Sequence, residues 1–480
     1  MYSFYDFEVS HFLKLLKSGL INDHIGEILE QFQSFGVEAQ YEIVKYLREM
    51  RMPVSLDAFS KALKISQEDA RKILLDSGKI VPLVLVKEGK GFLSEMLVIK
   101  GTLKNITNLP DVKRDLKTVS DFAQTNFAVF FKDEFVGKSF MLPLAVALVV
   151  DNLPPDLVFT GRIDKEGNVY DVGEIEKKRE ACKIYGKRLI EPLFVPNVKF
   201  IKDWLDRTVF DIPFYVTSNI QNPQSEFETF AVSIGIDLSE LLKGLSTFYS
   251  IGLEDLYITT GSLSGEDDWV HSVEKFYHRL STIRSKLSGR EHVHFAMRGP
   301  ASLGMALGMV YGSQNPLTLY HFQNNQFIKI PVENIRSLKE RNVSSESVKY
   351  AFEKGELDEI AVILSFAHHE AVADATNYIA RILPERPSIL VIEHERKGNL
   401  EPQEFIDVAR SISSIIQDLR KEHSFKCFHF FLSCPVLLAF LVGMAFGYYS
   451  NGYIYNYQKG QEEIYIRAIS LEKVRKIREN

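Results

Sequence analysis

Three short motifs between residues 137 and 192 carry side chains suited to chemistry. Gly137-Lys138-Ser139 precedes an apolar helical stretch, Thr160-Gly161 follows a strand-like run, and a lysine-rich helical segment spans 174–181. Gly-Lys-Ser also ends the phosphate-binding loop G-x-x-x-x-G-K-[ST], but that loop needs glycine at 132, where Lys132 stands. We therefore expect no ATP-binding loop here.

Whether Ser139 can act as a nucleophile depends on which side chain could take the proton of its hydroxyl. A serine hydroxyl is a poor nucleophile until a base within hydrogen-bond reach takes its proton. No histidine lies near these motifs, which disfavours a Ser-His-Asp arrangement. Lysine can be the base if burial lowers its pKa toward neutrality. Backbone N–H groups at the start of the Ser139 helix would then stabilise the oxyanion.

The order of these motifs resembles the protease domain of Lon. In that family a serine opens a helix, Thr-Gly-Glu lies on a strand, and Gly-x-Val leads through Gly-Gly into a helix with the catalytic lysine. The resemblance implies Ser139 as nucleophile, Lys178 as base and Thr160 as the residue that orients the amine. It covers about residues 80–215 and includes the strand-like segment 83–103.

Several positions depart from the Lon pattern. The serine lies in Gly-Lys-Ser-Phe-Met rather than Gly-Pro-Ser-Ala-Gly, Glu174 replaces the second glycine, and Arg162 follows Thr-Gly in place of an acidic residue. We expect Phe140 to narrow the substrate channel, which would make the protease more selective. Lys177 is the competing choice for the base, and a decayed, inactive Lon-like scaffold is the alternative to an active site.

An internal repeat lies in the C-terminal part of the chain. Residues 294–326 align with 429–461 at a constant offset of 135 and without a gap. Ten positions of 33 are identical, where chance would give about two: His294/His429, Phe295/Phe430, Pro300/Pro435, Leu303/Leu438, Gly308/Gly443, Met309/Met444, Gly312/Gly447, Tyr320/Tyr455, Gln323/Gln458 and Gln326/Gln461. Each copy indicates a strand, a proline turn, an apolar helix ending at glycine, and a second strand.

The charge-free segment 427–449 has two interpretations. Its length suits a membrane crossing, which takes about 20 residues. It also fits a buried strand, a turn at Ser433-Cys434-Pro435 and a buried helix. The repeat favours the second, because the matching helix of the first copy contains Ser302 and follows Arg298.

The proline turns of the repeat predict a binding site for an anion. Two nucleotide-fold halves form a pseudo-dimer, and the start of a helix after each turn presents free N–H groups to phosphate. A ligand spanning both turns would be anionic and roughly two-fold, as a cyclic oligonucleotide is. The alternative is that the proline and glycine residues only shape the turns.

The repeated half resembles the SAVED domain of bacterial antiphage systems, over about residues 290–470. That resemblance implies a sensor of cyclic oligonucleotides built from two fused Rossmann-like halves. The candidate ligand-binding residues are Met297, Arg298, Gly299, Pro300, Ser302, Ser365, His368, Ser433, Cys434 and Pro435.

The fold class expected is α/β multidomain. The domains would be a helical domain at 1–79 with caps at Ser55 and Ser66, a Lon-type α+β protease domain at 80–215, a mainly helical linker at 216–289 and a SAVED domain with parallel sheets at 290–480. The halves of that last domain would lie near 290–425 and 426–480.

Composition excludes several classes of protein. The net charge is −6, from 57 Lys and Arg against 63 Asp and Glu, so a coat that binds nucleic acid by charge is excluded. Three cysteines, Cys182, Cys427 and Cys434, form neither a disulfide framework nor a four-thiolate metal site. They fit a reducing compartment, the chain starts without an export signal, and we expect a cytoplasmic protein.

A Lon-like protease joined to SAVED resembles the CRISPR-associated Lon proteases. That resemblance implies activation by cyclic tetra-adenylate from a type III CRISPR complex. It also implies ligand-induced homo-oligomerisation and cleavage of a partner protein such as an antitoxin or an anti-sigma factor.

Three alternatives stay open. They are a non-catalytic cyclic-nucleotide-binding scaffold that recruits a partner, a CBASS effector that responds to a cyclic di- or trinucleotide, and a membrane-anchored sensor. We expect no DNA partner, no membrane and no metal. Cyclic oligoadenylate is the only small molecule expected, as an activator rather than a cofactor.

Overall fold

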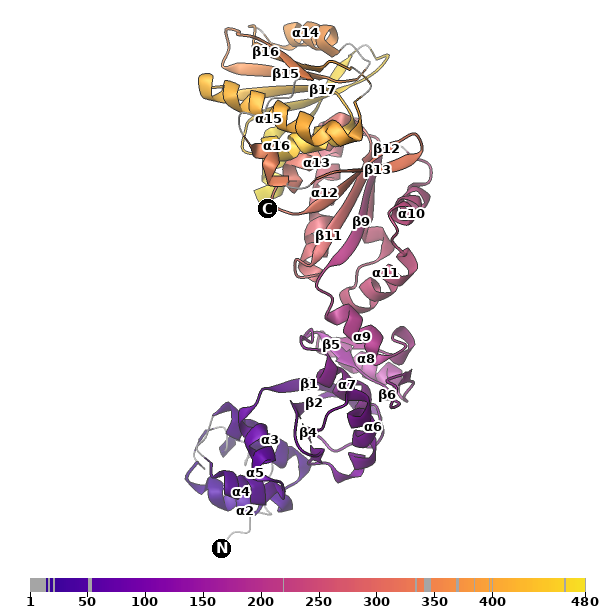
Figure 1. The fold of residues 1–480 in the computed structure, drawn as a ribbon, viewed down its shortest axis with the longest axis vertical. Helices are drawn as coiled ribbons and strands as arrows, with labels where there is room; N and C mark the ends of the chain where they lie inside the picture. The colour runs from indigo at the N-terminus through magenta and orange to yellow at the C-terminus, as the bar shows by residue number, and fades with distance from the viewer. Residues whose placement is uncertain are drawn as a thin grey trace. The chain divides into compact units, whose positions relative to one another are not determined.

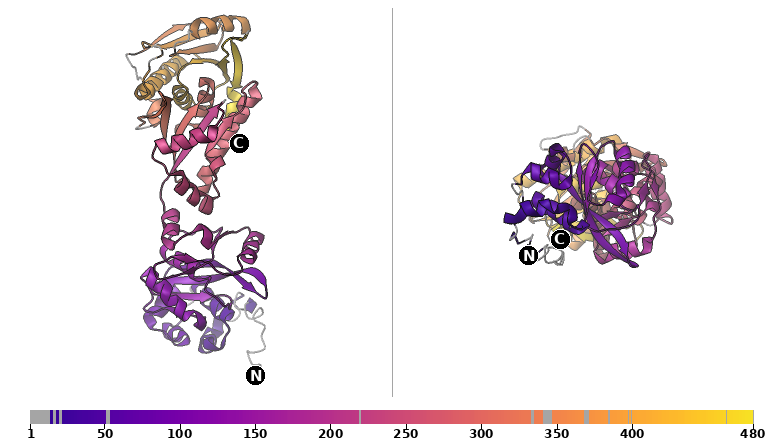
Figure 2. Two further views of the ribbon diagram at one scale, coloured as in Figure 1. Left: turned by 90° about the vertical axis from the view of Figure 1, so that its right-hand side faces the viewer. Right: turned by 90° about the horizontal axis from the view of Figure 1, so that it is seen from below.

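The computed structural model describes residues 14–15, 18–19, 22–50, 54–218, 220–332, 335–340, 347–367, 371–383, 385–396, 398, 400–461 and 463–479. The chain forms two compact units, Met1–Arg207 and Thr208–Asn480. In Figure 2 the first unit runs from indigo to purple and the second from magenta to yellow.

Between residues 22 and 75 the described chain forms four α-helices, which pack on a sheet rather than forming a core alone. They are α2 (Ile25–Glu30), α3 (Val37–Glu49), α4 (Leu56–Leu63) and α5 (Gln67–Leu75). The predicted caps are confirmed, because the Ser55 and Ser66 hydroxyls accept from the amides of Ala58 and Asp69. Apolar side chains of these helices share one core with Leu97, Ile99 and Phe130 of the sheet.

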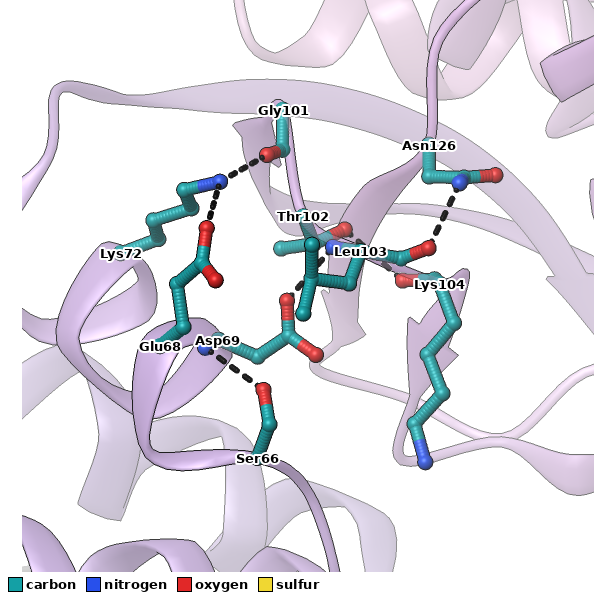
Figure 3. Close-up of polar contacts among 9 residues, drawn as sticks. All are labelled: Ser66, Glu68, Asp69, Lys72, Gly101, Thr102, Leu103, Lys104 and Asn126. Carbon is teal, nitrogen blue, oxygen red and sulfur yellow. Dashed lines mark hydrogen bonds and ion pairs between the residues drawn. The ribbon is translucent and has the colours of Figure 1, made fainter.

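Polar contacts of α5 also join the helices to the sheet (Figure 3). Asp69, 1% exposed, accepts from the Leu103 amide at 2.6 Å, and the Lys72 amine donates to the Gly101 carbonyl at 2.8 Å. The Asp69 carboxylate and the Lys72 amine therefore fix α5 to the loop that follows residue 100 at the end of the second strand of the sheet.

The first sheet has the order β1-β2-β4-β3. Its strands are β1 (Gly78–Lys87), β2 (Lys90–Lys100), β3 (Ile106–Thr107) and β4 (Phe127–Phe131). β1 and β2 form an antiparallel hairpin, and both overlap the segment that the sequence predicts to be strand-like. Its turn residues Glu88 and Gly89 both have positive φ, 51° and 74°, which the right-handed twist of a two-residue hairpin requires.

The motifs singled out in the sequence lie on short elements beside this sheet. The helices are α6 (Lys113–Ala123), α7 (Met141–Val149), α8 (Ile175–Ile184) and α9 (Val198–Leu205). The strands are β5 (Leu157–Phe159), β6 (Arg162–Ile163), β7 (Val169–Tyr170) and β8 (Arg188–Ile190). β5 pairs with β8 and β6 with β7.

The second unit contains two sheets. The first has the order β10-β9-β11-β12-β13, built from β9 (Phe210–Ser218), β10 (Tyr257–Thr260), β11 (Glu291–Arg298), β12 (Leu317–Gln323) and β13 (Gln326–Ile330). Its first four strands are parallel and β13 is antiparallel. The helices of this half are α10 (Pro223–Ser233), α11 (Leu238–Gly244), α12 (Glu266–Lys286) and α13 (Ala301–Tyr311).

The second sheet repeats this order and adds one strand. It runs β14-β16-β15-β17-β18-β19, with β14 (Val348–Glu353), β15 (Glu359–Ser365), β16 (Ser388–His394), β17 (Cys427–Ser433), β18 (Gly452–Tyr457) and β19 (Tyr465–Ser470). The helices are α14 (Ala371–Ile382), α15 (Phe405–Glu422), α16 (Val436–Phe446) and α17 (Leu471–Glu479). β11-α13-β12-β13 therefore corresponds to β17-α16-β18-β19, as the sequence repeat predicts.

The two repeated helices, α13 and α16, pack against each other between the sheets (Figure 1). Two identical positions of the repeat, Gly308 and Gly443, lie at this crossing. A Cβ on Gly308 would overlap the Phe440 carbonyl, and one on Gly443 would overlap the Met305 carbonyl. Glycine is retained in both copies because each helix backbone touches the other.

The boundaries of the second unit differ from those expected. β9 and β10 are paired members of the same sheet as β11, so residues 216–289 are part of the first half rather than a linker. That half spans about 208–332, and the second sheet runs from β14 to β19. Neighbouring strands of a parallel sheet are joined by long connections, so they lie far apart along the chain. The repeat covers only 294–326 and 429–461, and it therefore gave no indication that β9 and β10 belong to the same sheet as β11.

Segment 427–449 folds as the strand β17, a turn and the helix α16, which confirms the second interpretation. Among the described residues, no helix has the length and apolar character that a membrane crossing needs.

Candidate functional site

The first unit has a pocket of about 440 Å³ where the Gly137-Lys138-Ser139 motif meets the helical segment 174–181. Its lining comes from β1, the loop before α7, β6 and the loop leading into α8. The lining residues are Leu85, Val86, Phe135, Val136, Gly137, Lys138, Ser139, Arg162, Asp171, Val172, Gly173, Glu174 and Lys178. Two of the three predicted catalytic residues, Ser139 and Lys178, thus line one cavity.

Ser139 lies just before α7 and is held by backbone bonds to the Thr160 segment. Its carbonyl accepts from the Gly161 amide at 3.1 Å, and the Leu142 amide donates to the Gly161 carbonyl at 3.0 Å. These two bonds fix the serine loop against the segment that carries the predicted threonine. The Ser139 side chain is half-buried at the pocket wall.

Lys178 projects from α8 and is 5% exposed. Its amine donates to the Thr160 hydroxyl at 3.4 Å, and Thr160 itself is 1% exposed. Burial lowers the pKa of Lys178 below its ordinary value, against the opposing charges of Glu174 and Asp171. The buried amine is therefore shifted toward the neutral form that a base needs.

Lys177, the competing choice, has a different environment. Its side chain is 43% exposed and forms an ion pair with Glu174 at 2.7 Å. α8 approaches β2 closely at Gly91, where a Cβ would overlap the Lys177 carbonyl. The helix is therefore oriented with Lys178 inward and Lys177 outward.

The Ser139 hydroxyl and the Lys178 amine are not hydrogen-bonded to each other, although both lie in the described part of the chain. The amine is held by Thr160 instead. Catalytic hydrogen bonds are often long before substrate binds and tighten in the complex. For the serine hydroxyl to bond the amine, one of these two side chains would have to move.

The departures from the Lon pattern have distinct structural consequences. Glu174 has φ 61° and ψ 36°, the left-handed region, so the backbone here is one that glycine adopts without strain. Arg162 lines the pocket, with its guanidinium 5.0 Å from the centre of the Tyr170 ring.

The expectation that Phe140 narrows the substrate channel is wrong. Phe140 is 1% exposed and packs edge-on against Phe131, with ring centres 5.4 Å apart, and against Phe135 at the same distance. Burying the large aromatic side chain of Phe140 in this apolar core is more favourable in free energy than exposing it to the polar pocket.

The predicted ligand residues of the second unit lie at the carboxyl ends of β11, β15 and β17. Arg298 donates to Glu226 at 2.6 Å, and its guanidinium lies 4.7 Å from the centre of the Phe322 ring. Pro300 and Pro435 precede α13 and α16, and neither helix has a side-chain cap. The first-turn N–H groups of both helices therefore lack the side-chain acceptor that usually caps them.

Other predicted ligand residues are buried. Met297 and Ser365 are at most 1% exposed, and the Ser302 hydroxyl donates to Asn456 of β18 at 2.7 Å, joining the two halves. The Ser433 carbonyl accepts from the amides of Phe366 and Ala367. These buried residues support the turns that follow β11, β15 and β17.

Gly299 is exposed, and Cys434 is partly exposed beside Pro435. His368 lies outside the described residues. Sequence reasoning missed Glu226, Phe322 and Asn456, because each comes from a distant element and carries no local motif.

Comparison with known proteins identifies the C-terminal part of the chain. Residues 337–471 match the family SAVED, the "SMODS-associated and fused to various effectors sensor domain". No curated protein matches the chain.

Solved structures with similarity include Cap4 SAVED/CARF-domain containing receptors. That of Acinetobacter baumannii with the cyclic trinucleotide 2'3'3'-cAAA has 15% identity and a TM-score of 0.36, covering 57% of this chain and 54% of its own. That of Moraxella osloensis has 14% identity and a TM-score of 0.35, covering 62% and 57%. The chain thus spans little more than half of these proteins. By the family match, its residues 337–471 form a SAVED sensor domain.

Proposed function

We propose that this chain is a serine protease with a Ser139–Lys178 dyad, activated by a cyclic oligonucleotide bound to its SAVED-containing unit. The proposed activator is cyclic tetra-adenylate, and the proposed substrate is a specific partner protein. The observation that carries the enzymatic part is that Lys178 and Ser139 line one pocket. The Lys178 amine is buried, its pKa is lowered, and it donates to the Thr160 hydroxyl beside that pocket.

The chemistry follows from these positions. The neutral Lys178 amine takes the proton of the Ser139 hydroxyl as its oxygen attacks a peptide carbonyl. The resulting ammonium returns that proton to the departing amine, which leaves an acyl ester on Ser139. A water molecule, deprotonated by the same amine, then hydrolyses the ester.

The oxyanion of the tetrahedral intermediate needs N–H donors beside Ser139. The Met141 and Leu142 amides already donate to the Lys138 and Gly161 carbonyls. Within the described chain, the amides of Ser139 and Phe140 have no backbone acceptor. They are therefore the donors proposed for the oxyanion.

The sensing part of the proposal is supported by the family match and by the turns of the second unit. Arg298 supplies a cation near the uncapped start of α13, and α16 repeats that start in the other half. An anionic ligand with repeated phosphates suits two such helix ends.

The test is cleavage of a peptide mixture by the full chain, analysed by mass spectrometry with and without cyclic di-, tri-, tetra- and hexa-adenylate. We expect cleavage only with one of these ligands, its loss in Ser139→Ala and Lys178→Met, and its retention in Lys177→Met. Size-exclusion chromatography under the same conditions should show assembly. Assembly without cleavage would favour the non-catalytic scaffold, and cleavage that survives Ser139→Ala would refute the dyad.

A further inference from the structure

A cluster of three potential metal ligands lies at the amino ends of two central strands in the second unit. Glu359 begins β15 and pairs in register with Cys427 at the start of β17. His429 follows two residues later and therefore lies on the same face of the sheet. One atom from each residue lies within 4.8 Å of the others.

The distances in this cluster suit a transition-metal ion. His429 Nε2 lies 2.8 Å from Glu359 Oε2 and 3.5 Å from Cys427 Sγ. Zinc bonds of 2.0–2.3 Å in a tetrahedron place the ligand atoms about 3.3–3.8 Å apart. The 3.5 Å separation already falls in this range. The 2.8 Å separation is a hydrogen bond that the ion would replace, with the two atoms moving about 0.5 Å apart.

A further contact orients the histidine. His429 Nδ1 lies 3.0 Å from the Tyr455 hydroxyl, and His429 is 3% exposed. Metal-binding histidines commonly hold their second nitrogen in such a bond, which fixes the ring and directs the other nitrogen at the ion. Tyr455 therefore leaves Nε2 directed at the cluster.

The same arrangement occurs in the first half. Asp211 of β9 pairs with His292 of β11, and His294 Nε2 lies 3.0 Å from Asp211 while Nδ1 lies 3.0 Å from the Tyr320 hydroxyl. His292 and Cys427 are separated by the repeat offset of 135. The hydrogen bonds from the acid through histidine to tyrosine do not involve His292 or Cys427. Both copies nevertheless have a side chain at this position that can bind a metal.

We propose that Glu359, Cys427 and His429 bind a Zn²⁺ ion, with water as the fourth ligand. The site lies at the end of the strands opposite the proposed nucleotide turns, and it joins β15 to β17. The spacing of cysteines in the sequence gave no sign of it, because one ligand comes from a different strand. This inference does not depend on Ser139 or Lys178.

The first half provides the internal comparison. There His292 Nε2 already bonds the Thr318 hydroxyl at 2.9 Å, and the Asp211 side chain is 63% exposed. That cluster contains no thiolate, so Co²⁺ bound there would give no thiolate charge-transfer band.

The test is titration of the metal-free full chain with Co²⁺, whose bond to a thiolate produces a charge-transfer band in the near ultraviolet. We expect the band at one ion per chain, displaced by Zn²⁺. Cys427→Ser should remove it, Cys434→Ser and Cys182→Ser should retain it, and Tyr455→Phe should weaken affinity about 10- to 100-fold.

Matching unfolding curves of the metal-free Cys427→Ser and wild-type chains establish that the variant folds. If it does not fold, Glu359→Gln replaces it, with an expected loss of Co²⁺ affinity in competition with a chelator. A wild-type chain without the band, or a band unchanged in Cys427→Ser, would overturn the proposal.

Discussion

At Lys178 the surroundings of one side chain determine its chemistry. The amine is buried, its pKa is lowered mainly by desolvation, and its hydrogen bond goes to the Thr160 hydroxyl. The residue types and motif order named both residues from the sequence. The resemblance to Lon already favoured Lys178 over Lys177. The direction in which α8 faces adds the physical reason, since Lys178 is buried and Lys177 is exposed.

Thr160 is predicted to position the base. Thr160→Val removes the hydroxyl but keeps the volume, so we expect kcat to fall about tenfold with KM nearly unchanged. Thr160→Ser should restore most of the activity. Steady-state kinetics on a cleaved peptide measure both values, and an equal loss in Thr160→Ser would contradict an orienting hydroxyl.

Glu174 is predicted to set the pH dependence of the base. Its negative charge raises the pKa of Lys178, so Glu174→Gln should lower that pKa further. Because the proposed mechanism uses the neutral amine, the acidic limb of the kcat/KM profile should move to lower pH by about half a unit. Glu176→Gln on the same helix is the control and should leave the profile in place.

At the scale of elements, the crossing of α13 and α16 depends on glycine. A Cβ on Gly308 would overlap the backbone carbonyl of Phe440, which a side-chain rotation cannot relieve. Gly308→Ala should destabilise the second unit by about 2–3 kcal/mol. Gly261→Ala, in the same unit with open space around it, should change stability little. Thermal unfolding compares the two, and equal curves would contradict the close packing.

Elements with strong local signals were predicted well. The strands β1 and β2 follow from their strand-like composition, the caps at Ser55 and Ser66 from their side chains, and the strand-turn-helix at 427–449 from the repeat. The place of β9 and β10 in the first sheet of the second unit depends on pairing between distant segments. Phe140 was misjudged for a similar reason, because it precedes α7 whereas its aromatic partner Phe131 lies on β4.

At the scale of the whole molecule, we expect a cyclic oligonucleotide to control the association of several copies of this chain. The turns at Arg298 and Cys434 are repeated within one chain, and a ligand with repeated phosphates can bridge neighbouring chains. We expect the activating cyclic oligonucleotide to shift the full chain to larger species in size-exclusion chromatography. Arg298→Ala should weaken this shift about tenfold in ligand concentration, and an unchanged shift would exclude Arg298 from the binding surface.

The central claim is that a messenger makes Ser139 reactive through Lys178. The most direct measurement is labelling of the full chain with a fluorophosphonate, located by tandem mass spectrometry, across a panel of cyclic oligoadenylates. The account predicts an adduct on Ser139 only with the activating ligand, and none in Lys178→Met. An adduct on another residue alone, equal labelling with and without every ligand, or no adduct at all would contradict it.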